Sequence, residues 1–393
     1  MPPKILVVDD EPDLEVMIRQ RFRKQIRDDE IRFEFAQNGV QALNRLDADP
    51  SISVILSDIN MPEMDGLTLL QKVGERNNPA IKSVIISAYG DMENIRTAMN
   101  RGAFDFLTKP INFNDLDVTV EKTMQQLELI RHALKARDEL VAVQRDLNTA
   151  NRIQQSLLPK RFPPFPDNPE IDIYAEMLTA KEVGGDFYDF YLIDQDRLAI
   201  AVGDVSGKGI PAAIYMAVSR TLLKAIAYQI VNPGEVLRKL NAMLIAESDT
   251  PTFVTVFYGV LNIHTGELQY SNGGHNLPYH VRSSGNIEQL PLSEGMLLGK
   301  FPHIDFETRK LRLDKGDTLF VYTDGVSEAM DPDMNMYEEA RLESYLRLTG
   351  GSALADLVKG SIADLKKHTR DAPQSDDITV LSLRYIGKNG MKL

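Results

Sequence analysis

Cysteine is absent from this chain of 393 residues, and acidic residues outnumber basic ones. The lack of thiols fits a reducing compartment and excludes disulfides, cysteine-zinc sites and mechanisms with a thiolate nucleophile. The 44 basic and 57 acidic residues give a net charge of −13, which repels nucleic acid and anionic membranes, and no basic patch offsets it. We therefore expect neither nucleic acid nor a membrane as a partner.

Long apolar runs are also missing. No stretch approaches the roughly 20 apolar residues that a membrane helix needs. Met1 to Ile5 lead directly into a strand pattern without a signal peptide, so the expected location is cytoplasmic. The length exceeds what one ordinary core accommodates, and we expect two or three folded units.

The first segment, residues 1–122, alternates short apolar runs with helical patterns. Five βα units of this kind predict an α/β domain with a doubly wound, parallel, five-stranded sheet. The expected strands are Lys4–Val8, Arg32–Phe35, Val54–Ser57, Ser83–Ser87 and Phe104–Thr108.

Acidic residues stand where these strands end. Asp9 and Asp10 follow the first strand, and Asp58 follows the third. Because ligands of a parallel sheet bind outside the carboxyl ends of its strands, the three carboxylates should share one crevice. Three carboxylates repel one another unless a cation joins them, and Mg²⁺ suits an all-oxygen site that keeps several waters.

Four motifs accompany these residues: Val7-Val8-Asp9-Asp10-Glu11, Asp58-Ile59-Asn60-Met61-Pro62-Glu63-Met64-Asp65-Gly66, Ser87-Ala88 and Phe106-Leu107-Thr108-Lys109-Pro110. Together they resemble the response-regulator receiver domains of two-component signalling, and the resemblance covers the whole segment. It implies that a sensor histidine kinase or phosphotransfer protein phosphorylates Asp58. It also implies a receiver Mg²⁺ held by Asp9, Asp10, Asp58 and the Asn60 carbonyl.

The same resemblance assigns three further roles. Lys109 would pair with a phosphoryl oxygen, Ser87 would donate a hydrogen bond to another, and Phe106 would be the switch aromatic whose rotamer follows phosphorylation. The Lys109–Pro110 bond is a candidate for the cis form. Two alternatives are aspartates that serve only as turn and cap residues, and a receiver that binds partners without being phosphorylated.

A linker follows, at residues 123–160. Residues 116–158 predict a long polar helix, and a series of apolar positions suggests a coiled-coil seam with an irregular register. Pro159 and the proline-rich run after it end the helix. We favour a signalling helix that forms a homodimer; the alternative is a solvated connector. The seam positions are Leu127, Ile130, Leu134, Leu140, Leu147, Ala150 and Leu157.

The third segment, residues 161–388, has helical stretches at about 211–230, 233–247, 338–348 and 352–369. It alternates at period two, as strands do, at Ile171–Tyr174, Leu198–Val202, Phe253–Asn262, Gly266–Ser271, Thr318–Tyr322 and Thr379–Tyr385. This pattern predicts an α+β domain in which two sheets pack as a sandwich between helices, an α-β-β-α arrangement. Four acidic motifs fall at strand ends or turns: Val183-Gly184-Gly185-Asp186-Phe187, Val202-Gly203-Asp204-Val205-Ser206-Gly207-Lys208-Gly209, Tyr322-Thr323-Asp324-Gly325 and Ser375-Asp376-Asp377-Ile378-Thr379.

These motifs, with Arg152-Ile153-Gln154-Gln155-Ser156-Leu157-Leu158-Pro159 and Ser271-Asn272-Gly273-Gly274-His275-Asn276, resemble metal-dependent protein phosphatases. The similarity is to the protein phosphatase 2C-like enzymes of the sporulation stage II protein E type. It implies direct hydrolysis of phosphoserine or phosphothreonine by two Mn²⁺ or Mg²⁺ ions.

By this resemblance Asp204 bridges the two ions and the Val205 carbonyl contacts the first, with Asp186 nearby. Asp324 and Asp376 hold the second. Asp377 remains an alternative ligand, since successive residues of a strand face opposite sides and only one of the pair can face the metals. His275 is interpreted as a structural hydrogen-bonding residue rather than a catalytic acid.

The combined prediction is a two-component response regulator whose phosphorylation controls a serine/threonine phosphatase. The resemblance implies that its substrate is a phosphorylated anti-sigma factor antagonist. The alternative is a non-catalytic, phosphorylation-dependent adaptor that binds a protein of a sigma-factor pathway. A transcription factor is disfavoured, because no helix-turn-helix pattern follows the receiver segment and the charge is acidic.

Overall fold

A computed structural model describes residues 2–247 and 251–387 of the protein. The chain forms two compact units, residues 1–143 and 144–393, each with its own core. The expected C-terminal boundary at residue 388 lies outside the described residues. The two units are treated separately below.

The first unit contains a five-stranded sheet of order β2-β1-β3-β4-β5 in which all neighbours are parallel, as predicted. Its carboxyl ends therefore meet at one edge, where the acidic residues lie. The strands are β1 (Lys4–Val8), β2 (Arg32–Ala36), β3 (Ile52–Asp58), β4 (Lys82–Ala88) and β5 (Asp105–Lys109).

Helices cover both faces of this sheet. Successive residues of β1 point to opposite sides: Ile5 packs with α1 and the start of α6, whereas Leu6 packs with α3 and α4. Burial on both faces explains why the central strands are nearly continuous apolar runs. The helices are α1 (Pro12–Arg21), α2 (Arg23–Arg27), α3 (Gly39–Ala48), α4 (Gly66–Glu75), α5 (Met92–Asn100) and α6 (Phe113–Leu157).

Helix α6 has 45 residues and contributes to both units. The expected long helix is thus confirmed. Leu127 was assigned to a coiled-coil seam, but this was wrong: its side chain is buried in the core of the first unit. Farther along, Leu129 and Leu140 are exposed, so apolar surface remains on the helix after its first turns.

The second unit contains two five-stranded sheets, of order β13-β10-β9-β8-β7 and β12-β11-β14-β15-β6, with antiparallel neighbours. Their strands are β6 (Ile171–Leu178), β7 (Phe187–Leu192), β8 (Arg197–Val205), β9 (Val254–Asn262), β10 (Glu267–Gly273), β11 (Tyr279–Val281), β12 (Ile287–Gln289), β13 (Arg309–Arg312), β14 (Thr318–Tyr322) and β15 (Ile378–Tyr385).

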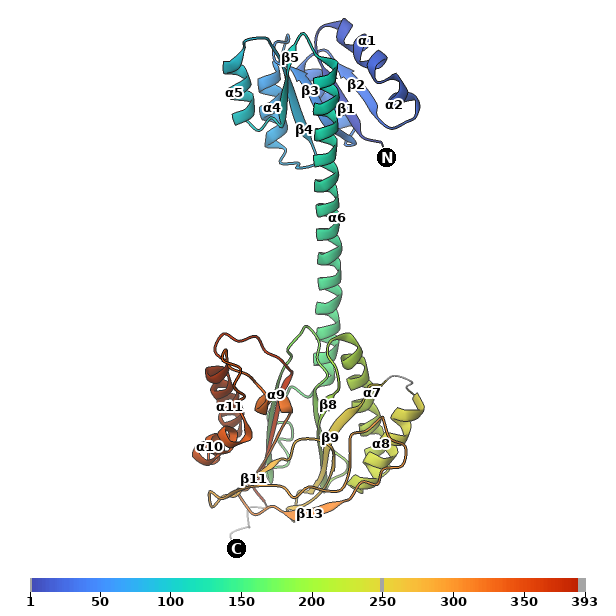
Figure 1. Cartoon of the computed structure of the whole chain (residues 1–393). Helices are drawn as coiled ribbons and strands as arrows, with labels where there is room; N and C mark the ends of the chain where they lie inside the picture. The colour runs from blue at the N-terminus through green and yellow to red at the C-terminus, as the bar shows by residue number, and fades with distance from the viewer. Residues whose placement is uncertain (1, 248–250, 388–393) are drawn as a thin grey trace. The chain divides into compact units, whose positions relative to one another are not determined.

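The sheets form the two inner layers of an α-β-β-α sandwich, as Figure 1 shows for this unit. Side chains of strand β14 alternate between the two faces of its sheet. Leu319 and Val321 face the core between the sheets, whereas Phe320 and Tyr322 pack with α10 and α11. The helices are α7 (Ile210–Ala227), α8 (Pro233–Glu247), α9 (Asp324–Ser327), α10 (Glu339–Thr349) and α11 (Leu354–Thr369).

Helix α7 corrects the expectation that no stretch is long and apolar enough for a membrane helix. Among the described helices it alone is long and apolar enough to cross a membrane, with a mean hydropathy of 1.3 over 18 residues. Its inner face, which includes Met216 and Leu223, is buried against the sheet core. We therefore interpret α7 as a core helix of this domain.

Candidate functional site

The first site lies at the carboxyl ends of β1 and β3. Asp9 and Asp10 follow β1, Asp58 is the last residue of β3, and one oxygen from each carboxylate lies within 4.8 Å of the others. Asp9 and Asp58 are buried, while Asp10 is exposed. Burial raises the pKa of Asp9 above its usual value, despite a hydrogen bond from the Glu11 amide. The expected convergence of the three aspartates is confirmed.

Lys109, the last residue of β5, offsets part of the negative charge of this cluster. Its Nζ lies 2.8 Å from Asp58 Oδ2, 3.0 Å from Asp9 Oδ2 and 3.0 Å from Glu11 Oε1. Burial alone would lower the pKa of Lys109, but the contacts with these three carboxylates raise it, so the ammonium stays charged. The peptide bond to Pro110 is cis, as predicted. The contact with Glu11 was not expected from the sequence.

The surroundings of Asp58 match the remaining expected positions in part. Its Oδ1 accepts a 2.6 Å hydrogen bond from the Ile59 amide. Ser87, on the neighbouring strand β4, is fully buried, and its hydroxyl has no hydrogen-bond partner among the described residues. Phe106 on β5 is partly exposed, and Asn60 lies exposed in the turn after Asp58.

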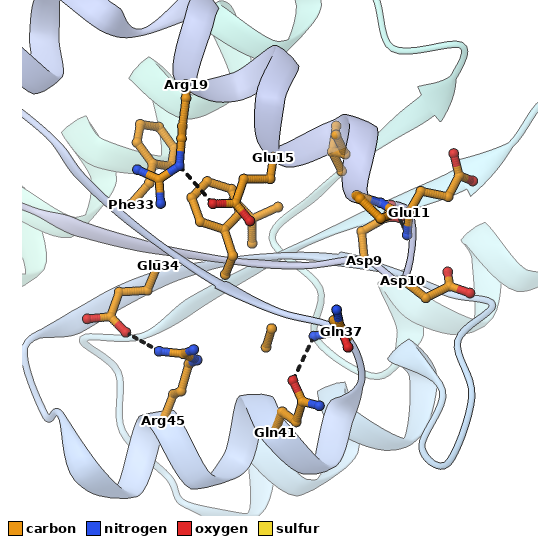
Figure 2. Close-up of a pocket in the computed structure, with 15 residues that line it drawn as sticks. Asp9, Asp10, Glu11, Glu15, Arg19, Phe33, Glu34, Gln37, Gln41 and Arg45 are labelled. Carbon is orange, nitrogen blue, oxygen red and sulfur yellow. Dashed lines mark hydrogen bonds and ion pairs between the residues drawn. The ribbon is translucent and has the colours of Figure 1, made fainter.

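A groove of about 620 Å³ runs beside this cluster between α1, β2 and α3. Figure 2 shows Asp9 and Asp10 at one end of it. Its two guanidinium groups already pair with carboxylates: Arg19 with Glu15 at 2.8 Å and Arg45 with Glu34 at 2.9 Å. Because both guanidinium groups are paired with carboxylates, the groove offers little free positive charge to an anionic ligand.

The second site joins the two sheets of the second unit. Asp186 directly precedes β7, Asp204 lies near the end of β8, Asp324 begins α9 after β14, and Asp376 and Asp377 directly precede β15. Strands β7 and β8 are paired in one sheet and β14 and β15 in the other. Residues from four distant parts of the sequence are thereby brought together.

Mutual repulsion is strong in this second cluster. Burial, followed by the charges of Asp204 and Asp377, raises the pKa of Asp186, although Thr323 Oγ1 donates a 2.8 Å hydrogen bond to its Oδ2. Burial and then Asp324 raise the pKa of Asp204 to about 7. These carboxylates therefore lack sufficient positive charge from the protein itself.

The donor set fits hard divalent cations. It consists of carboxylate oxygens with the Val205 carbonyl nearby in sequence, and such cations would relieve the repulsion that raises the pKa values. Within residues 2–247 and 251–387, the receiver cluster is the one group with three carboxylate oxygens within 4.8 Å of one another. The described aspartates of the second unit do not meet that distance criterion.

Asp376 and Asp377 have different surroundings. Asp377 is buried, and its Oδ1 accepts the Ala180 amide at 2.8 Å while its Oδ2 accepts the Gly185 amide at 2.6 Å. A Cβ on Gly184 would lie 2.3 Å from Asp377 Oδ2, so only glycine fits there without displacement. Asp376 is partly exposed and faces Lys208, with Oδ2 3.0 Å from its Nζ. The other oxygen, Asp376 Oδ1, accepts the Asp377 amide at 2.9 Å. Asp377 thus holds the loop before Asp186.

Gln154, near the end of α6, was not recognised as a site residue from the sequence. It is buried, its Nε2 donates to the Gly184 carbonyl at 2.6 Å, and its Oε1 accepts the Gly184 amide at 3.0 Å. The helix end is therefore tied to the loop that carries Asp186. The available signal was a polar residue at a position near the apolar seam of the helix.

His275 is part of the support behind Asp204. Its Nδ1 lies 3.0 Å from Thr255 Oγ1, and Thr255 is the cross-strand partner of Asp204. The Asn272 side chain bonds both the amide and the carbonyl of His275. Burial lowers the pKa of His275 to about 4, so the ring is neutral at neutral pH. This environment is that of a structural residue.

Comparison with known families agrees with both halves of this description. Residues 5–121 match the family described as response regulator receiver domain, and residues 194–386 match stage II sporulation protein E. The second unit also resembles the solved SiaA-PP2C domain of Pseudomonas aeruginosa, with a TM-score of 0.55 and 22% identity over 63% of this chain and 98% of that one. At this identity the likeness shows the fold.

Two curated relatives are also similar. Protein IcfG of Synechocystis sp. (strain ATCC 27184 / PCC 6803 / Kazusa) is 31% identical over 268 residues, which span 61% of this chain and 41% of the relative. Phosphoserine phosphatase RsbU of Bacillus subtilis (strain 168) is 28% identical over 242 residues, which span 62% of this chain and 70% of the relative. The chain thus spans less than half of the first relative.

Together, the folds and these matches define a protein with two different domains. Its first unit is a response-regulator receiver domain, and its second has the fold of the metal-dependent, protein phosphatase 2C-like phosphatases. Within this second domain, residues 194–386 match the stage II sporulation protein E family.

Proposed function

We propose that phosphorylation of Asp58 controls a metal-dependent protein serine/threonine phosphatase in the C-terminal domain. The observation that carries this proposal is the presence of two acidic clusters in one chain. In the first, Asp58 contacts Lys109 at 2.8 Å; in the second, Asp204 lies among mutually repelling aspartates. Each cluster has the residues that its chemistry requires.

In the receiver, Asp58 acts as the phosphoacceptor for a sensor histidine kinase or a phosphotransfer protein. Asp9, Asp10, Asp58 and the Asn60 carbonyl would hold Mg²⁺, which neutralises charge during phosphoryl transfer. Lys109 would pair with a phosphoryl oxygen, and its positive charge 2.8 Å from Asp58 supports this role.

Two other receiver residues would respond to the phosphoryl group. The Ser87 hydroxyl is buried on the strand next to Asp58 and has a free hydrogen to donate. Phe106, 38% exposed, has room to change rotamer when Ser87 moves toward the phosphoryl oxygen. Phosphorylation thereby becomes a change in packing on the β4 and β5 side of the domain.

In the phosphatase domain, Asp204 would contact both of two Mn²⁺ or Mg²⁺ ions. Asp186 and the Val205 carbonyl would serve the first, and Asp324 and Asp376 the second. Two such cations lower the pKa of a water molecule between them and stabilise the leaving oxygen of a phosphate ester. Asp377 accepts hydrogen bonds from two backbone amides, and this supports a role in holding the loop, with Asp376 as the metal ligand.

We assign residues 1–122 to the receiver, 123–160 to the linker and 161–388 to the phosphatase domain. The linker helix is the route by which receiver packing reaches the phosphatase, and a homodimer through its exposed apolar residues, such as Leu140, supplies a second contact that packing can alter. The protein is proposed to act in the cytoplasm, without nucleic-acid or membrane partners.

A relative is named a phosphoserine phosphatase, and this supports a phosphoserine or phosphothreonine substrate. We propose that the substrate is a phosphorylated anti-sigma factor antagonist. The test is incubation of the purified protein with the purified, phosphorylated antagonist. We expect the antagonist to lose its phosphate and inorganic phosphate to be released. An antagonist that stays phosphorylated while a small phosphate ester is hydrolysed would overturn this substrate assignment alone.

Catalysis is tested by hydrolysis of p-nitrophenyl phosphate by the full chain with Mn²⁺, for the wild type and Asp204→Asn. The variant keeps the size of the side chain but loses the charge, so we expect turnover to fall by at least about a hundredfold. Absence of turnover in both proteins, with and without beryllofluoride on Asp58, would instead support the non-catalytic adaptor.

A further inference from the structure

Lys208 contacts the second acidic cluster and has no role in the function proposed above. It lies in the loop between β8 and α7, and its Nζ is 3.0 Å from Asp376 Oδ2. The same ammonium donates a hydrogen bond to the Ser375 carbonyl. It is also near enough to Asp324 to favour the ionised form of that carboxylate.

The loop is shaped to deliver this side chain. Gly207 and Gly209, on either side of Lys208, have φ of +92° and +79°, which side chains other than glycine rarely adopt. The loop follows β8, in the sheet that begins with β13, whereas Asp376 precedes β15, in the other sheet of this domain. Lys208 therefore forms an ion pair that crosses from one sheet to the other at the site.

The charge balance makes this contact distinctive. Among the described residues, Lys208 and Asp376 form the only ion pair that includes an aspartate of the second cluster. Both side chains are partly exposed, at 40% and 37%, so the ammonium can leave toward solvent without breaking a buried contact. Such a pair is weak, in the range in which a competing cation can replace it.

We propose that Lys208 is a built-in counter-ion of Asp376 that the second divalent cation has to displace, so that this lysine sets the affinity of that half of the site. The inference rests on the proposed metal-dependent function. A carboxylate oxygen that coordinates Mg²⁺ lies about 2 Å from the ion. The Lys208 ammonium, 3.0 Å from the same Asp376 oxygen, would repel the incoming ion.

The consequence is a competition rather than a stabilising contact. With Lys208 in place, the carboxylates are partly neutralised, and a divalent cation has to break the ion pair before it binds. Without the lysine charge, the cation meets an unpaired Asp376. Exposed ion pairs of this kind correspond to an affinity change of about two- to fivefold, which is the expected gain.

The test is isothermal titration of Mn²⁺ into the full chain carrying Asp9→Asn, which removes one receiver ligand and so weakens the receiver's contribution. Lys208→Met is compared with Lys208→Arg, which keeps the charge, and with Lys239→Met, which removes an exposed charge elsewhere in the domain. Circular dichroism checks that each variant is folded. We expect Lys208→Met to bind its weaker Mn²⁺ about two- to fivefold more tightly, while the other two stay close to the parent.

Unchanged or weaker Mn²⁺ binding in Lys208→Met would overturn the proposal. Inorganic phosphate is titrated in the presence of saturating Mn²⁺ as a second readout. Loss of phosphate affinity with unchanged Mn²⁺ affinity would make Lys208 a phosphate-binding residue instead of a counter-ion. A separate outcome concerns the proposed metal-dependent function. That function would fail if adding Asp204→Asn to the parent left its Mn²⁺ binding unchanged.

Discussion

Replacing Arg220 with methionine is expected to destabilise the phosphatase domain by about 3 kcal/mol. Arg220 lies on α7, and its Nη2 is 2.7 Å from Asp189 Oδ2 on β7. The Asp189 side chain is only 2% exposed, and burial raises its pKa even with Arg220 present. Removing the guanidinium therefore leaves a buried carboxylate with little compensation.

The magnitude follows from what remains around Asp189. Loss of one partner of a buried ion pair costs about 3–5 kcal/mol, because the other charge stays buried and unpaired. Lys224 Nζ, 3.8 Å from Asp189 Oδ2, keeps some compensation, and the Phe190 amide still donates to Oδ1 at 2.9 Å. The lower end of the range is therefore expected.

Differential scanning calorimetry of the full chain measures the effect, with the phosphatase transition identified as the one that Mn²⁺ shifts. For a domain of this size, about 3 kcal/mol corresponds to a fall in Tm of about 6–12 °C. The matched control is Arg238→Met on α8, whose guanidinium is exposed and 3.9 Å from Glu235, and we expect a change within about 0.5 kcal/mol.

A double variant separates the charge from the packing. Asp189→Asn combined with Arg220→Met removes both charges but keeps an oxygen that can accept the Phe190 amide, so at least half of the lost stability should return. A Tm for Arg220→Met equal to that of the Arg238 control would refute the reasoning. So would a double variant as unstable as the single one.

Three further predictions concern the support of the second site. Gly325→Ala should abolish Mn²⁺-dependent hydrolysis, because the new Cβ would lie 1.9 Å from the Asp377 carbonyl oxygen; turnover near that of the wild type would contradict this. Gln154→Leu removes both hydrogen bonds to Gly184 and should lower stability by about 2 kcal/mol, seen as a lower Tm of the phosphatase transition. Burial lowers the pKa of His275 to about 4, so between about pH 6.5 and pH 4 the unfolded chain binds a proton that the folded chain does not. Stability should be complete above about pH 6.5 and fall by about 3 kcal/mol as the pH drops to about 4, and His275→Gln should remove that part of the slope in chemical-unfolding titrations.

The receiver fold was largely predictable because its strands are buried on both faces. The expected strand at Lys4–Val8 agrees with β1 at both ends. The third strand was expected to start at Val54 but begins at Ile52, since the intervening Ser53 is polar and yet buried. Local composition could not reveal that burial.

The phosphatase fold was predictable where strands alternate at period two and not where they are short or continuous. Strand β7 was missed because it is buried along nearly its whole length and contains Asp189, whose charge is matched only by Arg220 on a distant helix. The short strands β12 and β13 were missed as well, since their polar residues show no buried face and only pairing defines them.

The site residues divide along the same line. Positions with motif spacing, such as Asp58 and Asp204, were located from the sequence. The contact of Lys109 with Glu11 and the hold of Asp377 on the Gly185 amide depend on which groups the fold brings together. Backbone amides carry no sequence signal, so those roles required the structure.

The central claim is that the receiver controls the phosphatase, and hydrolysis of a phosphoserine peptide by the full chain with Mn²⁺ tests it most directly. The rate is measured with and without beryllofluoride, a mimic of the phosphoryl group on Asp58, in the wild type and in Asp58→Ala. We predict a changed rate in the wild type and no change in Asp58→Ala. Equal rates with and without beryllofluoride in the wild type, at full occupancy of Asp58, would contradict the account.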